Sequence, residues 1–367
     1  MKNTFGNNVT FTLFGESHGE EIGVVIDGLA PGVAINKEFI DSQLAKRRPS
    51  GKISTGRVEP DPYRIVSGVH NGYSTGTPIC ILIPNTNTRS KDYGKMEDIP
   101  RPGHADYTAF CKYHGFQDKR GGGHFSGRIT APLVAAGAIA IDILNNMGIK
   151  IGTHVARCAG IDDAAFTDYS SDIDKLNQAT FAVLGADSEE KMVKAIEEAA
   201  AEGDSVGGIL ETAIIGMPAG VGEPWFDTFE SIISHMLFSV PAVKGVEFGD
   251  GFAMADMRGS QANDAFYMDN DKVKTKTNHN GGVNGGITNG MPIIIKSVVK
   301  PTPSIYKEQD SVNLNRNEDT KLSIEGRHDP AIIHRARVVV DSVIAMCVVD
   351  MLSARFGTDY LVDWNRK

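Results

Sequence analysis

Side chains that bind anions and transfer protons are concentrated between Arg101 and Arg128. This segment contains three histidines, three arginines, two lysines and the run Gly121-Gly122-Gly123, and it has no strong apolar periodicity. Arginine and lysine supply permanent positive charge for phosphate or carboxylate, histidine moves a proton near neutral pH, and consecutive glycines let backbone N–H groups approach an anion. We therefore expect the wall of a pocket for an anionic substrate. Its candidate residues are Arg101, His104, Asp106, Arg120, His124, Ser126 and Arg128.

Two shorter motifs near the N-terminus carry related chemistry. Ser17 and His18 lie between two glycines, which predicts a proton-transfer group on a tight turn at the rim of a pocket. An ordinary polar turn fits the same residues. The cationic run Lys46–Arg48 precedes a Pro-Ser-Gly turn at the end of a predicted helix. Either this run binds an anion, or its charges offset the helix dipole.

Three motifs in the C-terminal half complete the set. The stretch Asn278–Gly290 has two Gly-Gly pairs that can lie flat against a planar ring or a phosphate, without the strand-turn-helix context of a dinucleotide fingerprint. Lys300–Ser304 places a lysine and hydroxyl groups on a stiff turn that suits a terminal phosphate. Asp329 stands where a helix N-cap belongs. Because helix N-termini also bind anions, cap and active-site carboxylate are compatible roles.

The histidines of the central segment do not match a known metal site. His104, His114 and His124 are spaced ten residues apart, which is not a zinc pattern, and the chain contains no H-E-x-x-H sequence. We therefore expect no bound metal.

Capping signals and apolar periodicity predict the helices that position these motifs. The segment 131–147 is almost wholly apolar, so its helix belongs inside the molecule. A long helix with a broad apolar face ends at Gly357 and has Pro330 in its first turn. Further helices are expected over residues 37–48, 187–202 and 227–238. The expected N-caps are Asn36, Asp187, Asp227 and Asp329.

Short runs rich in isoleucine and valine predict strands at residues 24–27, 79–83, 209–216 and 292–299. Strands and helices do not alternate in strict β-α-β order, so an α+β layered fold is expected. The polar, glycine-rich stretch 269–290 is interpreted as a loop. With no linker and no short-period repeat, residues 1–367 are expected to form a single compact domain.

Composition narrows the possible partners and location. The net charge of −9 argues against general nucleic-acid binding, so the cationic clusters suit a small anionic ligand. The four cysteines form no C-x-x-C pair, which fits a reducing cytoplasm. No signal peptide is expected at the N-terminus, and no run approaches the ~18 apolar residues of a membrane span.

Seven motifs in order resemble the chorismate synthase family: FGESHG, RRPSG, RPGHADYT, GGG-x-x-S-x-R, GGI-T-NG, KPTPS and GRHDP. They span Phe14 to Pro330. The resemblance implies a lyase that converts 5-enolpyruvylshikimate 3-phosphate to chorismate and phosphate by 1,4-anti elimination, the last common step of the shikimate pathway to aromatic amino acids. It also implies reduced FMN without net redox change, a β-α-β sandwich with helices packed between antiparallel sheets, and a homotetramer.

The resemblance assigns roles to individual residues. His104 is similar to the family's general acid for the leaving phosphate, and His18 to the histidine beside the flavin. Asp329 would relay the ring proton, with Ser17 and Ser126 as hydroxyl partners. The substrate anions would be held by Arg47, Arg48, Arg128 and Arg327. The flavin would lie against Arg47, His124, Phe125, Ser126, Ala242, Gly285 and Arg327, with its phosphate on Lys300, Pro301, Thr302, Pro303 and Ser304.

The chain departs from the family pattern at Ala331, where a cysteine is frequent, and at two positions where the family has charged side chains. Many members have a glutamate where this chain has Ile129 and a second arginine where it has Leu133, so the local salt network must be rearranged. The sequence leaves open whether the protein reduces FMN with NADPH itself or depends on an external flavin reductase.

Two other classes of function compete with the lyase. A metal-dependent phosphohydrolase that used the histidine cluster would contain stoichiometric metal and lose activity to a chelator. A polyanion-binding scaffold would bind heparin or nucleic acid in a salt-sensitive manner, which the acidic net charge opposes.

Overall fold

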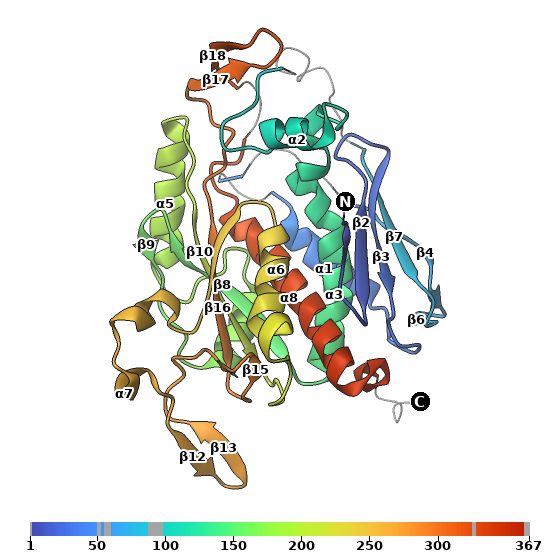
Figure 1. The fold of residues 1–367 in the computed structure, drawn as a ribbon, viewed down its shortest axis with the longest axis vertical. Coiled ribbons are helices and arrows are strands. Elements are labelled where there is room, and N and C mark those ends of the chain that lie inside the picture. Colours follow the sequence, from blue (N-terminus) through green and yellow to red (C-terminus); the bar gives the residue numbers. More distant parts are fainter. Residues whose placement is uncertain (1, 50–52, 55–59, 87–97, 325–327, 363–367) are drawn as a thin grey trace.

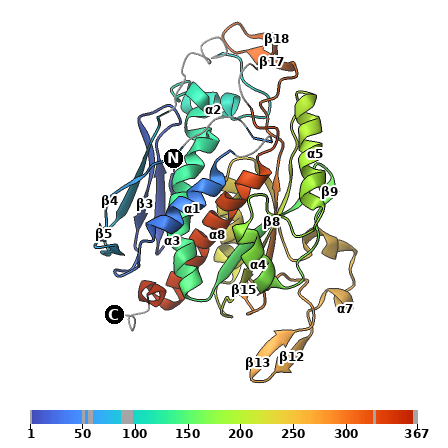
Figure 2. The ribbon, with the colours of Figure 1, turned by 180° about the vertical axis from the view of Figure 1, so that it is seen from behind.

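Two five-stranded antiparallel sheets enclose a layer of helices in the computed structural model, which describes residues 2–49, 53–54, 60–86, 98–324 and 328–362 (Figures 1 and 2). The first sheet has the order β1 (Thr4–Phe5), β2 (Thr10–Phe14), β3 (Glu21–Asp27), β7 (Ile79–Pro84) and β4 (Arg64–Ser67). The second has the order β11 (Val243–Phe248), β16 (Ile293–Val299), β10 (Gly208–Ile215), β8 (Lys150–Cys158) and β9 (Ile161–Asp162). The expected α+β class and the sandwich of helices between antiparallel sheets are confirmed.

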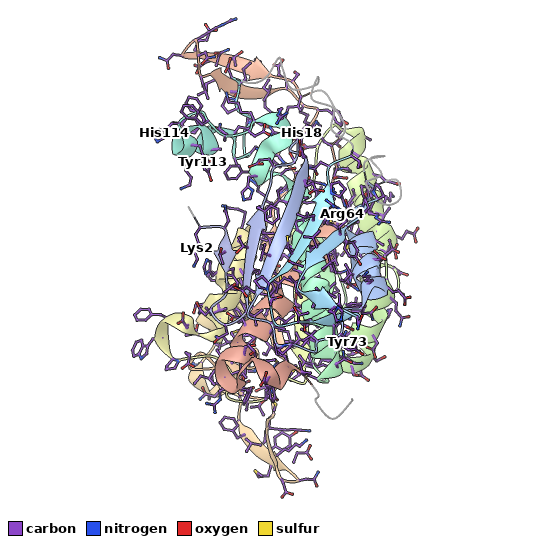
Figure 3. All side chains as sticks on the ribbon, turned by 90° about the vertical axis from the view of Figure 1, so that its right-hand side faces the viewer. Lys2, His18, Arg64, Tyr73, Tyr113 and His114 are labelled. Carbon is purple, nitrogen blue, oxygen red and sulfur yellow. The ribbon has the colours of Figure 1, made fainter. Side chains whose placement is uncertain are left out.

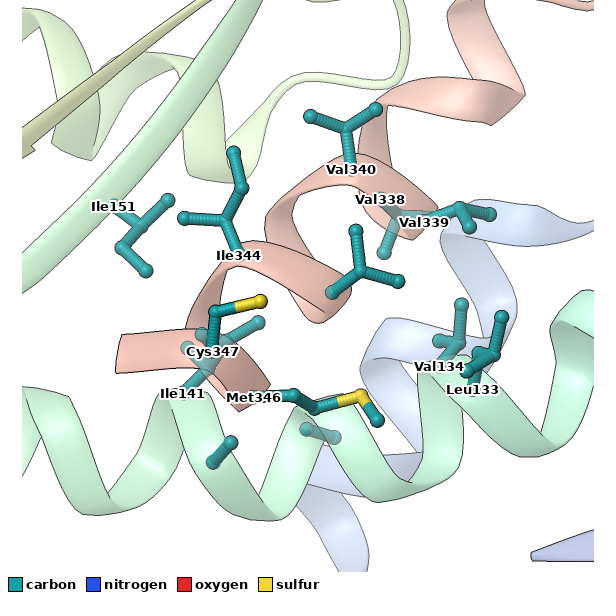
Figure 4. Packing of buried hydrophobic residues seen from close by; sticks show 14 of the residues in the cluster. Leu133, Val134, Ile141, Ile151, Val338, Val339, Val340, Ile344, Met346 and Cys347 are labelled. Atoms are coloured by element: carbon teal, nitrogen blue, oxygen red, sulfur yellow. The ribbon is translucent and has the colours of Figure 1, made fainter. Parts of the chain in front are cut away.

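Three helices fill the space between the sheets: α1 (Lys37–Arg47), α3 (Thr130–Asn146) and α8 (Ile333–Phe356). α3 packs on β3 and β7 of the first sheet, and α8 packs on β8 and β10 of the second. α3 and α8 approach closely because position 137 is glycine: a Cβ there would lie 2.6 Å from the Ser342 Cα. Figure 4 shows the apolar side chains around this contact, with Ile344 of α8 near Ile151 of β8.

The buried helix that the sequence predicted at 131–147 is confirmed as α3. Within the described part of the chain, the segment Gly127–Asn146 is long and apolar enough to cross a membrane, but 83% of its apolar window is buried inside the protein. Its position between two sheets accounts for that composition, because a helix covered on all sides is apolar all round.

The other predicted helices are present, but two of their caps differ. Asn36 caps α1 as expected, since its Oδ1 accepts from the Phe39 N–H at 3.0 Å. The helix predicted at 187–202 is α5 (Ser188–Ala201), although Asp187 makes no capping bond. The helix predicted at 227–238 is α6 (Phe229–Ser239), and its cap is Thr228 instead of Asp227. A threonine hydroxyl one residue later satisfies the same orphan N–H groups.

The prediction that Asp329 caps the last helix is wrong. α8 begins at Ile333, and its N-cap position, Ile332, makes no side-chain capping bond. The Asp329 carboxylate instead accepts from Arg335, with Nη1 to Oδ2 at 2.7 Å. The fold thereby forgoes a cap that typically contributes about 1 kcal/mol. The expected end of the helix is confirmed, with Gly357 at the C-cap.

The four predicted strands are confirmed as β3, β7, β10 and β16. Sequence analysis missed β8, which pairs with β10 inside the second sheet. α8 covers one face of β8 and α4 (Tyr169–Gln178) packs against it as well, so the strand is buried over most of its length. A strand covered on both faces lacks the polar–apolar alternation by which strands are usually found.

The prediction of a continuous loop at 269–290 is wrong. The region contains the hairpin β12 (Phe266–Asp269) with β13 (Lys272–Thr275), which projects from the body in Figure 1, and the small hairpin β14 (Val283–Asn284) with β15 (Ile287–Thr288). The remaining elements are α2 (Asp106–Tyr113), α7 (Gly259–Ala262), β5 (Val69–His70), β6 (Tyr73–Ser74), β17 (Gln309–Asn313), β18 (Glu318–Leu322) and the 3-10 helices Arg120–Phe125, Gly127–Ile129, Trp225–Asp227, Gly251–Asp256 and Thr358–Leu361.

A buried histidine on β8 joins two acidic side chains. His154 Nδ1 lies 2.7 Å from Asp163 Oδ2, and His154 Nε2 lies 3.0 Å from Glu211 Oε2. Burial alone would lower the pKa of His154, but the hydrogen bonds to the two carboxylates outweigh burial and raise it. Both ring nitrogens then donate, so the ring is an imidazolium in the folded protein.

We expect this cluster to make stability depend on pH. Because the folded pKa lies above the unfolded value of about 6.5, the stabilisation is fully present below about pH 6.5 and is lost as pH rises through the folded pKa. In urea unfolding, the stability gap between wild type and His154→Gln should therefore shrink between about pH 6 and about pH 9. The same substitution at the exposed His70 is the matched control and should have only a small effect on stability. A His154 gap that stayed constant would contradict a charged ring.

Candidate active site

The rings of His18 and His104 border two consecutive glycines. A methyl group built on Gly121 would overlap the His18 ring, and one built on Gly122 would lie 3.3 Å from His104 Cε1 and 3.5 Å from its Nε2. Consecutive Cα atoms are only about 3.8 Å apart, so the two histidines lie in one neighbourhood. Figure 3 shows His18 at the end of the molecule that carries Tyr113 of α2, far from Tyr73.

The glycine run holds this arrangement by its backbone conformation. Gly121, Gly122 and Gly123 all have positive φ, at 60°, 85° and 53°. L residues with a side chain seldom adopt such angles, and three in succession require glycine. The Gly123 carbonyl accepts from the Ser17 N–H at 3.1 Å, which ties the run to the loop of His18.

Ser17 fixes the tautomer of His18. The buried Ser17 hydroxyl lies 3.2 Å from the Arg120 carbonyl and 3.1 Å from the Gly121 carbonyl, and carbonyls can only accept. The hydroxyl proton therefore goes to a carbonyl, and Ser17 Oγ accepts from His18 Nδ1–H at 3.2 Å. In the neutral ring this places the lone pair of His18 on Nε2.

His104 is oriented by a carboxylate that is itself clamped by an arginine. His104 Nδ1 lies 2.7 Å from Asp106 Oδ1. Arg101 donates to the same carboxylate from its backbone N–H at 3.0 Å, from Nε at 2.8 Å and from Nη2 at 2.8 Å. Burial alone would raise the pKa of the Asp106 carboxyl, but these bonds outweigh it and hold the pKa well below its usual range. The carboxylate is therefore ionised and accepts Nδ1–H, while Nε2 of His104 lies on the side of Gly122, 3.3 Å from Arg101 Nη2.

Arg128 connects the His18 loop to the end of α1. Its Nε donates to Asn85 Oδ1 at 3.0 Å, and Asn85 Nδ2 donates to the carbonyls of Glu16 at 3.0 Å and Gly19 at 2.9 Å. Arg128 also pairs with Asp61, and Arg47 Nη2 lies 3.3 Å from the other oxygen of the same carboxylate. One aspartate thus brings together two of the arginines expected to hold the substrate.

Asp61 is a site residue that sequence reasoning missed. Its side chain is only 1% exposed, and its backbone φ of 47° lies in the left-handed region. An aspartate flanked by prolines at 60 and 62 is a turn signal, which gave no indication of a buried ion pair. Arg48 lies beside this group and donates to the Pro60 carbonyl.

The Lys300–Ser304 turn docks on the loop that precedes His104. Lys300 Nζ donates to the Gly103 carbonyl, and Pro303 would lie 3.3 Å from a Cβ at Gly103. The Lys300 N–H donates to the Ala242 carbonyl at 2.9 Å, which brings Ala242 to the same place. The Thr302 hydroxyl is buried and makes no hydrogen bond within the described residues.

The His328-Asp329 segment approaches from the opposite end of the chain. Burial, and next the positive charge of Arg101, lower the pKa of His328 below its ordinary value. The His328 ring lies 5.6 Å from that of Tyr306, and its Nε2 is buried without a partner among the residues the structure covers. Asp329 pairs with Arg335. Arg327, expected to bind both substrate and flavin, lies outside the described residues.

Some of the other residues predicted to contact the flavin lie near His18 and His104, and one lies far from them. His124 Nδ1 donates to the Gly15 carbonyl at 2.8 Å, and Ser126 Oγ accepts from the Arg128 N–H at 3.3 Å, so both lie in the cluster. Phe125 is partly exposed and makes an edge contact with Tyr113. Gly285 is not with them: it lies in the turn of the β14–β15 hairpin, at the end of the molecule opposite α2 (Figures 1 and 2).

The two residues that replace charged side chains of the family pattern are buried and apolar. Ile129 and Leu133 are each 5% exposed and belong to the main hydrophobic core. Arg128, next to Ile129 in the chain, forms its ion pair with Asp61. No group of three or more His, Cys, Asp or Glu side chains within the described ranges could hold a metal ion.

Known proteins resemble this chain over nearly its whole length. A family profile described as Chorismate synthase matches residues 9–353. The chain is 45% identical over 350 residues to a chorismate synthase of Pyrococcus abyssi, with 95% of this chain and 97% of that protein covered. It is 44% identical over 352 residues to one of Dehalococcoides mccartyi, with 96% of each covered. A solved structure titled "Crystal Structure of Chorismate Synthase" superposes with a TM-score of 0.75 at 27% identity, covering 96% of this chain and 94% of that chain.

Proposed function

Because the chain belongs to the chorismate synthase family, a family of lyases that form chorismate in the shikimate pathway, we propose how its own residues perform that reaction. The proposed step is a 1,4-anti elimination. The C–O bond to phosphate in 5-enolpyruvylshikimate 3-phosphate breaks, a ring proton is lost, and a second ring double bond forms. The observation that carries the proposal is the meeting of His18 and His104 across the glycine run.

His104 would act as the general acid on the leaving phosphate. Phosphate leaves more easily when it is protonated, and a positioned imidazole can supply that proton. Asp106 accepts Nδ1–H of His104 at 2.7 Å and so aims Nε2 away from itself, toward the side of Gly122. Arg101 holds the Asp106 carboxylate in place, which keeps the imidazole from rotating.

The cations around this histidine suit a substrate with a phosphate and two carboxylates. We assign Arg47, Arg48, Arg128 and Arg327 to these anions. Arg47 and Arg128 support the assignment because Asp61 fixes the positions of both guanidinium groups. A guanidinium that is already oriented loses little conformational freedom when it binds an anion.

The cluster also fits reduced FMN. The buried Thr302 hydroxyl and His328 Nε2 make no hydrogen bond with any described residue, and both belong to segments docked beside His104. Such buried polar atoms are costly unless a ligand satisfies them. The flavin would contact His124, Phe125, Ser126 and Ala242, with its phosphate on Lys300–Ser304. When bound, reduced FMN supplies electron density as phosphate leaves, without net redox change.

His18 and Asp329 would manage the protons that pass between the flavin and the substrate. His18 would keep the reduced cofactor correctly protonated, with the Ser17 hydroxyl holding the ring. Asp329 would relay the proton removed from the ring of the substrate, and Ser126 would add a second hydroxyl partner. The Arg335 guanidinium, with Nη1 2.7 Å from Asp329 Oδ2, holds that carboxylate in place.

We further propose that the protein assembles as a homotetramer in the cytoplasm. Gly285 lies in the β14–β15 turn, at the end of the molecule opposite α2, whereas His18 lies at the end that carries Tyr113 of α2 (Figures 1 and 3), so a flavin contact by Gly285 would come from a neighbouring copy. The side chains of Trp225, Phe226 and Phe252 are 83%, 92% and 85% exposed, and large exposed aromatics mark association surfaces. The four cysteines are free, which suits a reducing compartment.

Anaerobic mixing of the purified protein with dithionite-reduced FMN and 5-enolpyruvylshikimate 3-phosphate should release phosphate and form chorismate. Oxidised FMN should give neither product, and a chelator should have no effect. Failure to release phosphate would overturn the proposal, whereas chelator-sensitive release with stoichiometric bound metal would favour a metal-dependent phosphohydrolase. NADPH consumption in the same assay distinguishes internal reduction of FMN from the action of an external flavin reductase.

A further inference from the structure

The Arg335 guanidinium joins two segments that are far apart in the sequence. Its Nη1 donates to Asp329 Oδ2 at 2.7 Å, and its Nε donates to the Arg47 carbonyl at 2.7 Å. Both side chains of the ion pair are mostly buried, at 17% exposed each. Because a guanidinium is planar and rigid, it fixes the position of the Asp329 carboxylate relative to the end of α1.

This pair requires the unusual start of α8. In a continuous helix, neighbours on one face are three or four residues apart, whereas Asp329 and Arg335 are six apart. A helix that began at Pro330 would therefore separate the two side chains. α8 begins at Ile333 instead, and the residues between Asp329 and Ile333, which lie outside the helix, bring Asp329 back to Arg335. The local fold presents the carboxylate to the guanidinium and not to the helix N-terminus.

Arg47, whose carbonyl accepts from Arg335, is connected through further contacts to the loop that carries His18. The side chain of Arg47 pairs with Asp61, and Asp61 pairs with Arg128. Arg128 holds Asn85, whose amide donates to the carbonyls of residues 16 and 19 on both sides of His18. Every link in this series is a hydrogen bond or ion pair between described groups. Asp329 and His18 are thus attached to one polar framework.

We propose that Arg335 is a positioning residue for the elimination. It fixes the position of the Asp329 carboxylate relative to the loop that carries His18. This inference rests on the relay role proposed above for Asp329. Arg335 does not touch the substrate in this role; it acts through Asp329 and the Arg47 backbone. Lysine would keep the positive charge but lose the rigid fork that makes both bonds.

Steady-state kinetics of Arg335→Ala, Arg335→Lys, Asp329→Asn and the Ala/Asn double variant test this role. Arg335→Ala should lower kcat about 10–100-fold with little change in KM, because a misplaced reacting group costs turnover more than ground-state binding. Arg335→Lys should recover part of the loss. The double variant should be no slower than Asp329→Asn alone, since both changes remove one function. Calorimetric affinity of the cofactor-free protein for 5-enolpyruvylshikimate 3-phosphate should stay near the wild-type value for Arg335→Ala.

Arg355→Ala, which removes an exposed guanidinium from the other end of α8, is the matched control and should keep wild-type kinetics. A kcat for Arg335→Ala within threefold of wild type, losses that multiply in the double variant, or a rise in KM alone would overturn the inference. Wild-type turnover by Asp329→Asn would instead overturn the relay proposed for Asp329, and with it the role of Arg335. If Arg335→Ala does not fold, the same comparison is made with Arg335→Lys, Asp329→Asn and the Lys/Asn double variant.

Discussion

Replacing His104 with alanine is expected to lower kcat about 10²–10⁴-fold, the range typical for loss of a general acid. The structure gives the reason: Asp106 accepts Nδ1–H of His104 at 2.7 Å, and Arg101 clamps that carboxylate with further bonds. A group held in this way is positioned for proton transfer and not for packing. Stopped-flow measurement of chorismate formation with excess reduced FMN would give kcat directly.

The histidine at position 114 provides the control for this variant. His114 lies in the same segment but is exposed at the end of α2 with a left-handed φ of 55°. His114→Asn keeps a residue that tolerates this conformation, so the helix should be unchanged. It should turn over at the wild-type rate. A loss below threefold in His104→Ala would remove His104 from the mechanism.

Gly121→Ala is expected to lower kcat by about 10²-fold or more. The added methyl group would overlap the His18 ring and lie 2.9 Å from Ser17 Oγ, the atom that orients the ring. His18 must move, and a displacement of about 1 Å at a reacting group costs roughly 10²-fold in rate. The backbone φ of 60° adds strain for alanine, which lowers stability by about 1 kcal/mol.

A second glycine separates the two effects of this substitution. Gly148 also has a positive φ, at 77°, but a Cβ there meets no atom within 4 Å. Gly148→Ala should therefore lose stability by a similar amount and keep wild-type turnover. Thermal unfolding and kcat of both variants make the comparison. Equal turnover in Gly121→Ala and Gly148→Ala would mean that the His18 ring is not held against the glycine run.

Local signals predicted most elements because their causes are local. Asn36 caps α1 through its own side chain, and the apolar composition of 131–147 marks a helix covered on all sides. Prediction from local sequence failed where a residue outside the local pattern binds the same side chain. Asp329 has the sequence context of a cap, yet Arg335 takes its carboxylate. β8 has no alternation to detect, because helices cover it on both sides.

The candidate site also contains residues that the local sequence indicates and residues that only the fold brings together. The types of residue in the segment 101–128 and its glycine run are enough to indicate an anion pocket with proton-transfer groups. Asp61, which joins Arg47 to Arg128, had no such signal, because its role exists only when two distant arginines meet at one carboxylate. Gly285 belongs to a glycine-rich motif that suits a flavin contact, but it lies at the end of the molecule opposite α2 (Figure 1).

The sequence by itself determined the chemical groups, their order along the chain and the helices and strands whose signals lie within a few residues. The tertiary structure alone decided which of these groups meet. Ion pairs and hydrogen bonds act over about 3 Å, whereas the residues they join here are separated by tens to hundreds of positions. Packing of α3 and α8 between the two sheets brings those positions together, and sequence spacing carries no direct record of that distance.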